Sequence, residues 1–155
     1  QWGSAADQAT MYVALSDIAR TALPNSQATL PDPSTGAGMF ALRLDSGQRV
    51  WHTPPPADAC RGRDRCSPAQ SAAASAIPGV AFSGAVDGHI RAFAAADGKV
   101  VWRLKDLSSP SDADRLPNGN TLVAENTRIR EFDKDGKVVW QHERTWAVEA
   151  NRYYR

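Results

Sequence analysis

Polar residues able to do chemistry stand at the starts of two predicted strands. Gln70 and Ser71 begin one strand, and Asp112, Asp114 and Arg115 lie in another. A carboxylate can take up a proton or bind a hard cation, amides and hydroxyls can donate hydrogen bonds, and a guanidinium can pair with a carboxylate. Aspartate and serine before a strand also commonly bond nearby backbone N–H groups, so a structural role is the competing interpretation.

The two cysteines, Cys60 and Cys66, are separated by five residues that include a glycine. This spacing permits a small disulfide loop, which would persist in an oxidising compartment. Two free thiols in a mobile loop are the alternative. A zinc site is disfavoured because it needs further ligands and because three arginines surround the pair. The sequence also lacks the Cys-x-x-Cys-His motif of covalent haem attachment.

Other motifs for metal binding or nucleophilic catalysis are missing from the sequence. The histidines His52, His89 and His142 are not spaced as metal ligands. No Gly-x-Ser-x-Gly, phosphate-binding loop or His-Glu-x-x-His occurs. Residues 133–136 superficially resemble a calcium loop, but the downstream glutamate is missing and a hairpin turn explains them better. These patterns therefore predict no metal ligands.

Three segments of the chain end alike. They are residues 39–51 (MFALRLDSGQRVW), 90–102 (IRAFAAADGKVVW) and 128–140 (RIREFDKDGKVVW). Each has an alternating apolar stretch, a turn whose glycine lies four residues before a tryptophan, and a short second strand that ends on that tryptophan. Glycine can adopt the positive φ that hairpin turns require. The sequence therefore predicts the same β-hairpin three times.

A second hairpin precedes each of these, which gives a unit of four short strands. Successive tryptophans are 51 and 38 residues apart, a spacing typical of β-propeller blades. We expect an all-β fold, a partial β-propeller of about three four-stranded antiparallel blades in one unit over residues 1–155. The expected segments are blades at about 2–51, 68–102 and 109–141, long loops at 17–38 and 52–67, and the start of a further blade at 147–155.

Short alanine-rich stretches are predicted to be strands, and the end of the sequence repeats an earlier segment. The alanine-rich stretches 71–76 and 92–96 are too short and too closely bounded by turns for helices, and we expect them to be inner strands, where only small side chains fit. The segment 149–153 aligns with 112–116, acidic residue over acidic residue and arginine over arginine. A fourth blade therefore begins near the end of the sequence.

The repeated tryptophans, Trp51, Trp102 and Trp140, are predicted to be structural. A large ring at the same place in every blade can dock between the hairpins of the neighbouring blade, with its N–H bonded to a backbone acceptor. Stacking on a planar cofactor is the alternative. Packing is favoured because a cofactor is bound once, whereas packing recurs at every blade.

The overall charge disfavours some classes of partner. The net charge is +1, with 18 lysines and arginines scattered among 17 aspartates and glutamates, so no one-signed surface for nucleic acid or anionic lipid is expected. No apolar run approaches the length of a membrane span. Since the chain starts at Gln1 without a signal sequence, we expect a processed chain or a piece of a longer one.

The repeat resembles those of the pyrroloquinoline-quinone propellers. The pattern Ala-x-x-x-x-Ser/Asp-Gly-x-x-x-Trp at 41–51 and 92–102 carries the resemblance, and the runs 66–73, 77–84 and 87–93 are similar to polyvinyl alcohol dehydrogenases. This likeness covers about residues 1–102. Residues 109–153, with DADRLPNGNTLV at 112–123, look more like the repeats of arylsulfotransferase-like bacterial propellers. The chain is thus a natural mosaic, a fragment or an artificial join.

The resemblance implies an alcohol-oxidising enzyme of the bacterial periplasm or exterior that uses pyrroloquinoline quinone and calcium. Asp112 or Asp114 would then be the base or hold the cation, Gln70 and Ser71 would bond the quinone carbonyls, and Arg115 would pair with a cofactor carboxylate. Further candidates that begin inner strands are Ser4, Asp7, Asn151 and Arg152.

Two departures from the family pattern keep other functions open. The family repeat usually has aspartate eight residues before the tryptophan, where this chain has Arg43 and Ala94. Three blades also do not enclose a channel, so self-association or missing blades would have to cover the exposed blade faces. We expect a fragment or relative of a periplasmic quinoprotein alcohol dehydrogenase. The alternatives are a non-catalytic propeller module for binding or self-assembly, and an arylsulfotransferase-type enzyme.

Overall fold

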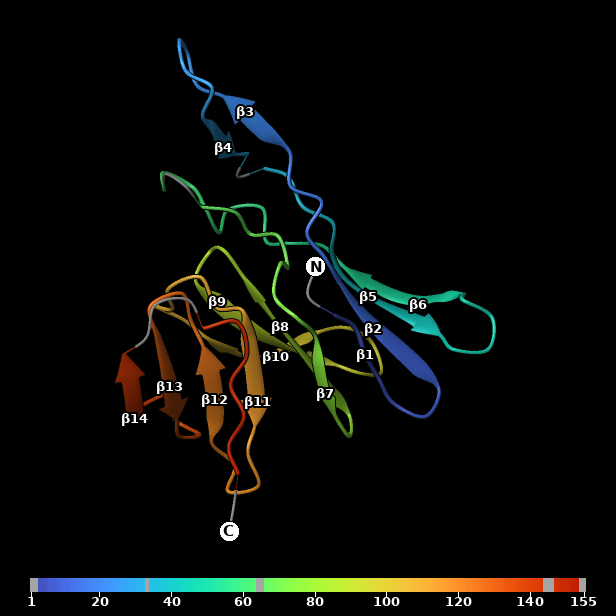
Figure 1. Cartoon of the computed structure of the whole chain (residues 1–155). Coiled ribbons are helices and arrows are strands. Elements are labelled where there is room, and N and C mark those ends of the chain that lie inside the picture. The colour runs from blue at the N-terminus through green and yellow to red at the C-terminus, as the bar shows by residue number, and fades with distance from the viewer. Residues whose placement is uncertain (1–2, 33, 64–65, 144–146, 154–155) are drawn as a thin grey trace.

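The computed structural model describes residues 3–32, 34–63, 66–143 and 147–153. Within these ranges the chain forms three four-stranded antiparallel sheets and one two-stranded hairpin. The three sheets follow one another along the chain as successive blades (Figure 1). The described ranges contain no helix able to cross a membrane. The all-β partial propeller predicted from the sequence is confirmed.

Blade 1 has the strand order β1-β2-β5-β6. Its strands are β1 (Ala5–Ala6), β2 (Thr10–Leu15), β5 (Gly38–Arg43) and β6 (Arg49–Thr53). Between β2 and β5 the chain forms an extra hairpin of β3 (Arg20–Ala22) and β4 (Thr29–Pro31), which projects from the blades in Figure 1. The described residues of the expected loop at 17–38 therefore lie outside the blades except for Gly38, which begins β5, and they include two strands of their own.

Blades 2 and 3 are uninterrupted four-stranded sheets. Blade 2 consists of β7 (Ser75–Ile77), β8 (Val80–Ala85), β9 (His89–Ala94) and β10 (Val100–Leu104). Blade 3 consists of β11 (Asp112–Arg115), β12 (Thr121–Ala124), β13 (Arg128–Phe132) and β14 (Val138–Glu143). In both blades each strand pairs with the next strand along the chain.

The two alanine-rich stretches expected to be inner strands differ from that expectation. The inner strand β7 begins only at Ser75, so residues 71–74 of the stretch 71–76 precede it. The second stretch, 92–96, is not an inner strand. Residues 92–94 belong to β9, the third strand of blade 2, and residues 95 and 96 lie at the following turn. Ala92 pairs with Trp102 across the sheet, as Ala41 pairs with Trp51 in blade 1. A small residue there leaves room beside the tryptophan ring, so the alanine reflects its cross-strand neighbour and not a place near the propeller axis.

The turn of the third outer hairpin is shorter than the other two. The N–H of Arg43 bonds the carbonyl of Gln48, and Ala94 bonds Lys99 in the same way, whereas the N–H of Asp133 bonds the carbonyl of Lys137. The turn glycines Gly47, Gly98 and Gly136 have φ of 67°, 71° and 81°. These values lie in the left-handed region, which explains why glycine recurs at this place in every blade.

The hydrophobic core lies between successive blades. One cluster joins Tyr12, Met39 and Trp51 of blade 1 to Ala81 and Phe93 of blade 2. A second cluster joins blade 2 to blade 3 through Ile90, Leu104, Val123 and Phe132. Each blade therefore buries one face against the next blade, as expected for stacked repeats.

Trp51 shows in detail how one blade docks on the next. Its ring lies 6.1 Å from that of Tyr12 and 6.5 Å from that of Phe93, and its Nε1–H donates a 2.8 Å hydrogen bond to the carbonyl of Ala95. The Oγ1 of Thr53 donates to the carbonyl of Gly98 at 2.6 Å. The outer strand of blade 1 is thus hydrogen-bonded to the turn between β9 and β10.

The exposure of the three tryptophans follows from their neighbours. Trp51 is 8% exposed. Trp102 is partly buried, packs edge-on against Phe82, and has the guanidinium of Arg115 from blade 3 at 5.0 Å over its ring. Trp140 has no complete fourth blade beside it and is 46% exposed. The same position is therefore buried only where another blade follows.

The close contact between Gly98 and Trp51 gives a paired stability test. A Cβ at Gly98 would lie 2.6 Å from Trp51 and 2.7 Å from Oγ1 of Thr53, whereas a Cβ at Gly47 would meet nothing within 4 Å. We expect Gly47→Ala to cost about 1 kcal/mol for its positive φ, and Gly98→Ala a further ~1–3 kcal/mol for overpacking. Urea unfolding of the two variants measures the difference, and equal losses would contradict this account of blade docking.

Candidate functional site

One cavity of about 490 Å³ is bordered by the residues just before β1, by the start of β7 and the residues before it, by β11, and by the final segment 147–153. The polar residues at its wall are Ser4, Ser75, Asp112, Asp114, Glu149 and Asn151. It lies where the three blades converge, which in Figure 1 is where β1, β7 and β11 approach one another. The innermost strands of a propeller surround its central axis, so the cavity lies at the axis and is the candidate functional site.

Hydrogen bonds between blades hold the inner strands in place around the cavity. The N–H of Ala74 donates to the carbonyl of Gly3 at 3.1 Å, and the N–H of Ala73 donates to the carbonyl of Ser111 at 3.2 Å. Ser75 Oγ donates to the carbonyl of Ala113 at 2.6 Å. The wall of the cavity is therefore held by hydrogen bonds between β7 and β11 and between the segments that precede the innermost strands.

The final segment continues this arrangement beyond blade 3. Ser111 Oγ donates to the carbonyl of Ala147 at 2.7 Å, as Ser75 does to blade 3. The N–H of Ala150 lies 3.5 Å from a carboxylate oxygen of Asp112. Residues 147–153 thus lie beside β11 in the way that β11 lies beside β7, which is the position of the innermost strand of a further blade.

Strand register explains why the acidic residues share the cavity. Ala5 pairs with Tyr12, Ser75 pairs with Phe82, and Asp114 pairs with Leu122 at the corresponding place of each blade. Asp112 precedes Asp114 by two residues, so both side chains lie on the same side of β11. Blades 1 and 2 have small residues at these positions, and blade 3 has two carboxylates.

The environment of the two aspartates raises their pKa values. For Asp112 the main cause is burial, followed by the negative charge of Asp114, while the N–H groups of Ala150 and Ala113 act in the opposite direction. For Asp114 the causes are burial and the negative charge of Glu149. A carboxylate whose pKa is raised is a stronger base than an ordinary aspartate, which suits proton abstraction near neutral pH.

Glu149 belongs to the same acidic group, although it was not among the sequence-predicted site residues. It lines the cavity with Asp112 and Asp114, and its carboxylate accepts a hydrogen bond from the amide of Asn151 at 2.8 Å. The signal was present in the sequence, because the segment 149–153 aligns with 112–116 and places Glu149 over Asp112.

Arg115 lies away from the two aspartates that precede it. Its guanidinium donates to the carbonyl of Gly119 at 2.8 Å and lies over the rings of Phe82 and Trp102 at 5.6 and 5.0 Å. Partial burial lowers its pKa. Because successive side chains of a strand alternate between its two sides, Arg115 faces the interface with blade 2 and is not among the residues lining the cavity.

Gln70 and Ser71 lie near the loops that connect the strands of blade 2. Gln70 forms an isolated bridge with Ala85, is 2% exposed, and its Oε1 has no hydrogen-bond partner within the described residues. Ser71 bonds the carbonyl of Gly84 through its N–H and lines a separate small depression with Ser109 and Asn126. The structure therefore does not bring these two residues together with the aspartates.

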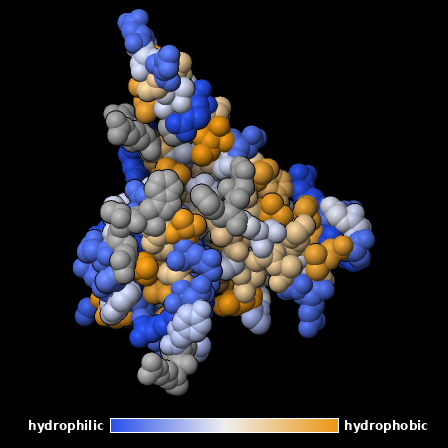
Figure 2. Space-filling view, in the orientation of Figure 1, coloured by the Kyte–Doolittle hydropathy of each residue, from blue (hydrophilic) through white to orange (hydrophobic). Residues whose placement is uncertain are grey.

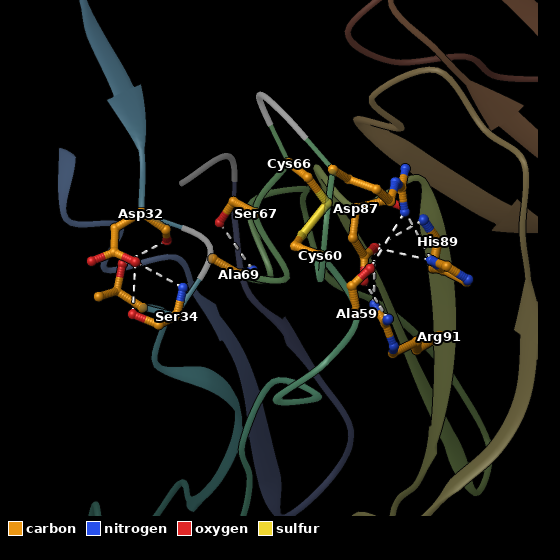
Figure 3. The surroundings of a disulfide bond; sticks show 12 residues. Asp32, Ser34, Ala59, Cys60, Cys66, Ser67, Ala69, Asp87, His89 and Arg91 are labelled. Atoms are coloured by element: carbon orange, nitrogen blue, oxygen red, sulfur yellow. Dashed lines mark hydrogen bonds and ion pairs between the residues drawn. A yellow bond between two sulfur atoms is a disulfide. The ribbon is translucent and has the colours of Figure 1, made fainter. Parts of the chain in front are cut away.

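Cys60 and Cys66 form a disulfide, and both are buried. The two cysteines lie beside Asp87, His89 and Arg91 of blade 2 (Figure 3), and Nη1 of Arg63 donates to the carbonyl of Asp87 at 3.1 Å. The carboxylate of Asp87 accepts a 2.5 Å hydrogen bond from Nη2 of Arg91, and both side chains are almost fully buried. The disulfide thus lies beside a buried ion pair of blade 2.

A similar buried ion pair occurs in blade 3. Glu125 pairs with Arg130 at 2.5 Å, and Nη2 of Arg130 donates to the carbonyl of Asp106 at 3.1 Å. In both blades the acid follows the second strand and the arginine lies in the third. Sequence reasoning missed both pairs, although the repeated order of acid and arginine was visible at 87–91 and 125–130.

The histidines take part in local packing. His52 stacks on Phe40 at 4.2 Å, and its Nε2 lies 2.5 Å from the carbonyl of Ala37. His89 lies beside Asp87. Among the residues that the structure describes, no group of three or more histidines, cysteines, aspartates or glutamates is arranged to hold a metal ion.

Two curated relatives share substantial sequence identity with the chain. It is 38% identical over 111 residues to a polyvinylalcohol dehydrogenase from a Pseudomonas species, a match that covers 71% of this chain and 16% of the relative. A second polyvinylalcohol dehydrogenase, from Sphingopyxis sp. strain 113P3, is 36% identical over 104 residues, with 66% of this chain and 14% of the relative covered. The chain thus spans about a sixth of the length of these relatives.

Comparison of structures and of family patterns gives the same architecture. The quinohemoprotein alcohol dehydrogenase of Comamonas testosteroni matches with a TM-score of 0.52 at 19% identity, over 86% of this chain and 19% of that structure, which supports the propeller fold. A family model described as outer membrane protein assembly factor BamB matches residues 40–152 and so spans both styles of repeat. The chain therefore belongs to this family of β-propeller repeats, as its repeated hairpins predicted.

Proposed function

We propose that this chain forms three consecutive blades of an extracytoplasmic quinoprotein alcohol dehydrogenase of the polyvinylalcohol dehydrogenase type. The observation that carries the proposal is the 38% identity to such an enzyme over 111 residues, repeated at 36% in a second one. The three blades follow one another along the chain and converge on an acid-lined cavity. The substrate class follows from the relatives, an alcohol bearing free hydroxyl groups.

The disulfide supports the extracytoplasmic part of this proposal. A bond between Cys60 and Cys66 persists in an oxidising compartment and is reduced in most bacterial cytoplasms. Among the described residues no free cysteine remains. The disulfide therefore persists if the enzyme is periplasmic or secreted.

We assign the role of base to Asp112 or Asp114. Their raised pKa values favour uptake of a proton, and both border a cavity large enough to admit a hydroxyl-bearing chain segment. In that role the carboxylate oxygen accepts the hydroxyl proton of the alcohol as its O–H bond breaks. Glu149 keeps the local charge negative and so strengthens the base.

The described residues of this chain do not fit pyrroloquinoline quinone itself. That cofactor is a tricarboxylate, and the cavity is lined by Asp112, Asp114 and Glu149 without a basic side chain. Arg115 is engaged between blades, and Arg152 forms an ion pair with Glu131. We therefore assign no cofactor contact to these three blades, and propose that they supply the acidic wall beside the reacting alcohol.

A graft tests this function within a complete ring. Residues 1–155 of this chain replace the corresponding three blades of the Pseudomonas polyvinylalcohol dehydrogenase, so that Asp112 and Asp114 lie inside the graft, and dye-linked oxidation of polyvinyl alcohol is measured. We expect the graft to remain active, and Asp112→Asn or Asp114→Asn in the graft to lower kcat by about 10²-fold or more, since general base catalysis has that magnitude.

The matched control for the graft is Asp97→Asn. Asp97 lies in an exposed turn and pairs with Lys99, so its substitution should leave kcat unchanged. Thermal melting first establishes that each graft is folded. A folded but inactive graft, or one in which both aspartate variants retain full activity, would contradict the assignment.

The raised pKa values also predict that the fold becomes more stable at pH 7 when the charge of Asp112 is removed. A carboxyl whose pKa is higher in the fold than in the unfolded chain destabilises the fold wherever it is ionised, and this cost vanishes below the ordinary aspartate range, where both states are protonated. We therefore expect Asp112→Asn to raise the free energy of unfolding at pH 7 by roughly 1 kcal/mol or less, and to have no such effect below about pH 3.5.

Asp97→Asn is the control, because the opposite change in the free energy of unfolding is expected for it. The hydrogen bond and charge of Lys99 lower the pKa of Asp97, so its ionised form stabilises the fold at pH 7 and the substitution should weaken it. Urea unfolding at pH 7 and pH 3 measures both variants. A loss of stability in Asp112→Asn at neutral pH would show that the carboxylate is structurally required, against the role proposed here.

A further inference from the structure

A smaller hollow lies beside the acid-lined cavity. It has a volume of about 170 Å³ and is lined by Ser71, Ser109 and Asn126, and we call it the serine depression. Its wall also includes Ser111 and five apolar residues, which are Ala72, Val86, Pro110, Ala147 and Val148. Blade 2, blade 3 and the final segment all contribute to it. The serine depression therefore lies between successive blade positions and is not a blade face left open at an end of the chain.

The serine depression and the acid-lined cavity follow one another along the same three segments, 71–75, 109–114 and 147–151. In each segment the residues that line the depression come before those that line the cavity, and Val148 lines both hollows. Hydrogen bonds of 3.2 and 2.7 Å from Ala73 to Ser111 and from Ser111 to Ala147 join the three segments side by side. Since one residue of extended chain covers about 3.3 Å, a flexible ligand of several carbon atoms reaches both hollows.

Three polar side chains of the serine depression are available to a ligand. The hydroxyls of Ser71 and Ser109 and the side-chain amide of Asn126 form no hydrogen bond with the residues that the structure describes. The hydroxyl of Ser111, in contrast, is bonded to the carbonyl of Ala147. Ser109 and Asn126 are exposed, so a ligand reaches them from solvent. Because a serine hydroxyl and an amide both donate and accept hydrogen bonds, they match the hydroxyl groups of a ligand.

The backbone at Ser109 adds an independent observation. Its φ is 47°, which lies in the left-handed region where glycine is favoured and a side chain is strained. Ser109 therefore places its hydroxyl at the serine depression at a cost to the stability of the fold. Strained residues of this kind are concentrated at binding sites, because there the side chain is needed for contact with a ligand.

The chemistry of the two hollows favours an uncharged ligand. No charged side chain lines the serine depression among the described residues, and the neighbouring cavity carries Asp112, Asp114 and Glu149, which repel anions. The apolar wall suits carbon atoms, and the hydroxyl and amide groups suit hydroxyls. A carbon chain that bears hydroxyl groups at short intervals has both properties.

We propose that the serine depression is a second binding subsite for a polyhydroxylated carbon chain. One hydroxyl of the chain lies in the acid-lined cavity, while another hydroxyl of the same chain bonds Ser71, Ser109 and Asn126. The carbon atoms between these hydroxyls contact the apolar wall of the depression. The class of ligand rests on the proposed dehydrogenase function, which supplies an alcohol with repeated hydroxyl groups.

Calorimetric titration of the 155-residue chain with short polyvinyl alcohol chains is the first test. We expect Ser109→Gly and Asn126→Ala each to weaken binding roughly three- to tenfold, the effect of losing one neutral hydrogen bond. Ser109→Gly should also keep or raise the melting temperature, because glycine adopts the positive φ without strain. A serine with a purely structural role would instead lower the melting temperature and leave binding unchanged.

Asn25→Gly and Gln27→Ala are the matched controls. Asn25 has a φ of 58° and lies between β3 and β4, so Asn25→Gly relieves the same backbone conformation away from the depression. Gln27→Ala removes an exposed amide from the same turn. The tip of this projecting hairpin is hydrophilic and stands apart from the blades in Figure 2. Both controls should bind the polymer like the unmodified chain.

The graft separates this inference from the proposed function. In an active graft the loss caused by Ser109→Gly or Asn126→Ala should fall on KM for polyvinyl alcohol rather than on kcat, whereas Asp112→Asn lowers kcat. An inactive graft, together with polymer binding that both variants weaken, would overturn the proposed function and leave the subsite standing. A chain that does not bind polyvinyl alcohol, or variants that bind it as tightly as their controls, would overturn the subsite even if the graft is active.

Discussion

The burial of one blade face against the next blade is the interaction on which the rest of this structure depends. A four-stranded sheet of this size has too little apolar surface to be stable alone, so each blade obtains its core from its neighbour. Trp51 illustrates the arrangement, because its ring, its N–H and the turn at Gly98 all meet at the blade boundary. The glycine of the repeated turn therefore has two functions, a positive φ and close approach of the preceding tryptophan.

The same stacking creates the candidate site. Asp112, Asp114 and Glu149 come from two segments that are adjacent only because the innermost strands of successive blades are bonded to each other. Neither aspartate forms an ion pair with a basic side chain of the described residues. Their pKa values are raised chiefly because the stacked blades partly bury them, and further because like charges lie nearby, which is a consequence of the architecture and not of any local sequence motif.

Repetition made the fold predictable from the sequence. Three copies of a hairpin that ends on tryptophan fixed the number of blades and the position of each outer strand, because the pattern recurs with the spacing of one blade. The repeat pattern gives no information about inserted segments, so the hairpin of β3 and β4 was expected to be a loop. Arg115 was grouped with Asp112 and Asp114 because all three begin the same strand, although the alternation of side chains places Arg115 on the other side of β11.

The distribution of charge separates structural from functional ionic groups. Arg91 and Arg130 are paired with Asp87 and Glu125 at the ends of their blades, where burial of a charge requires a partner. Arg115 lies on aromatic rings between blades. With these arginines committed to structure, the acids at the axis keep their negative charge uncompensated by neighbouring cations. Groups that destabilise a fold in this way are retained where their chemistry is needed, which is the strongest physical reason to look for function at Asp112 and Asp114 rather than at the repeated tryptophans.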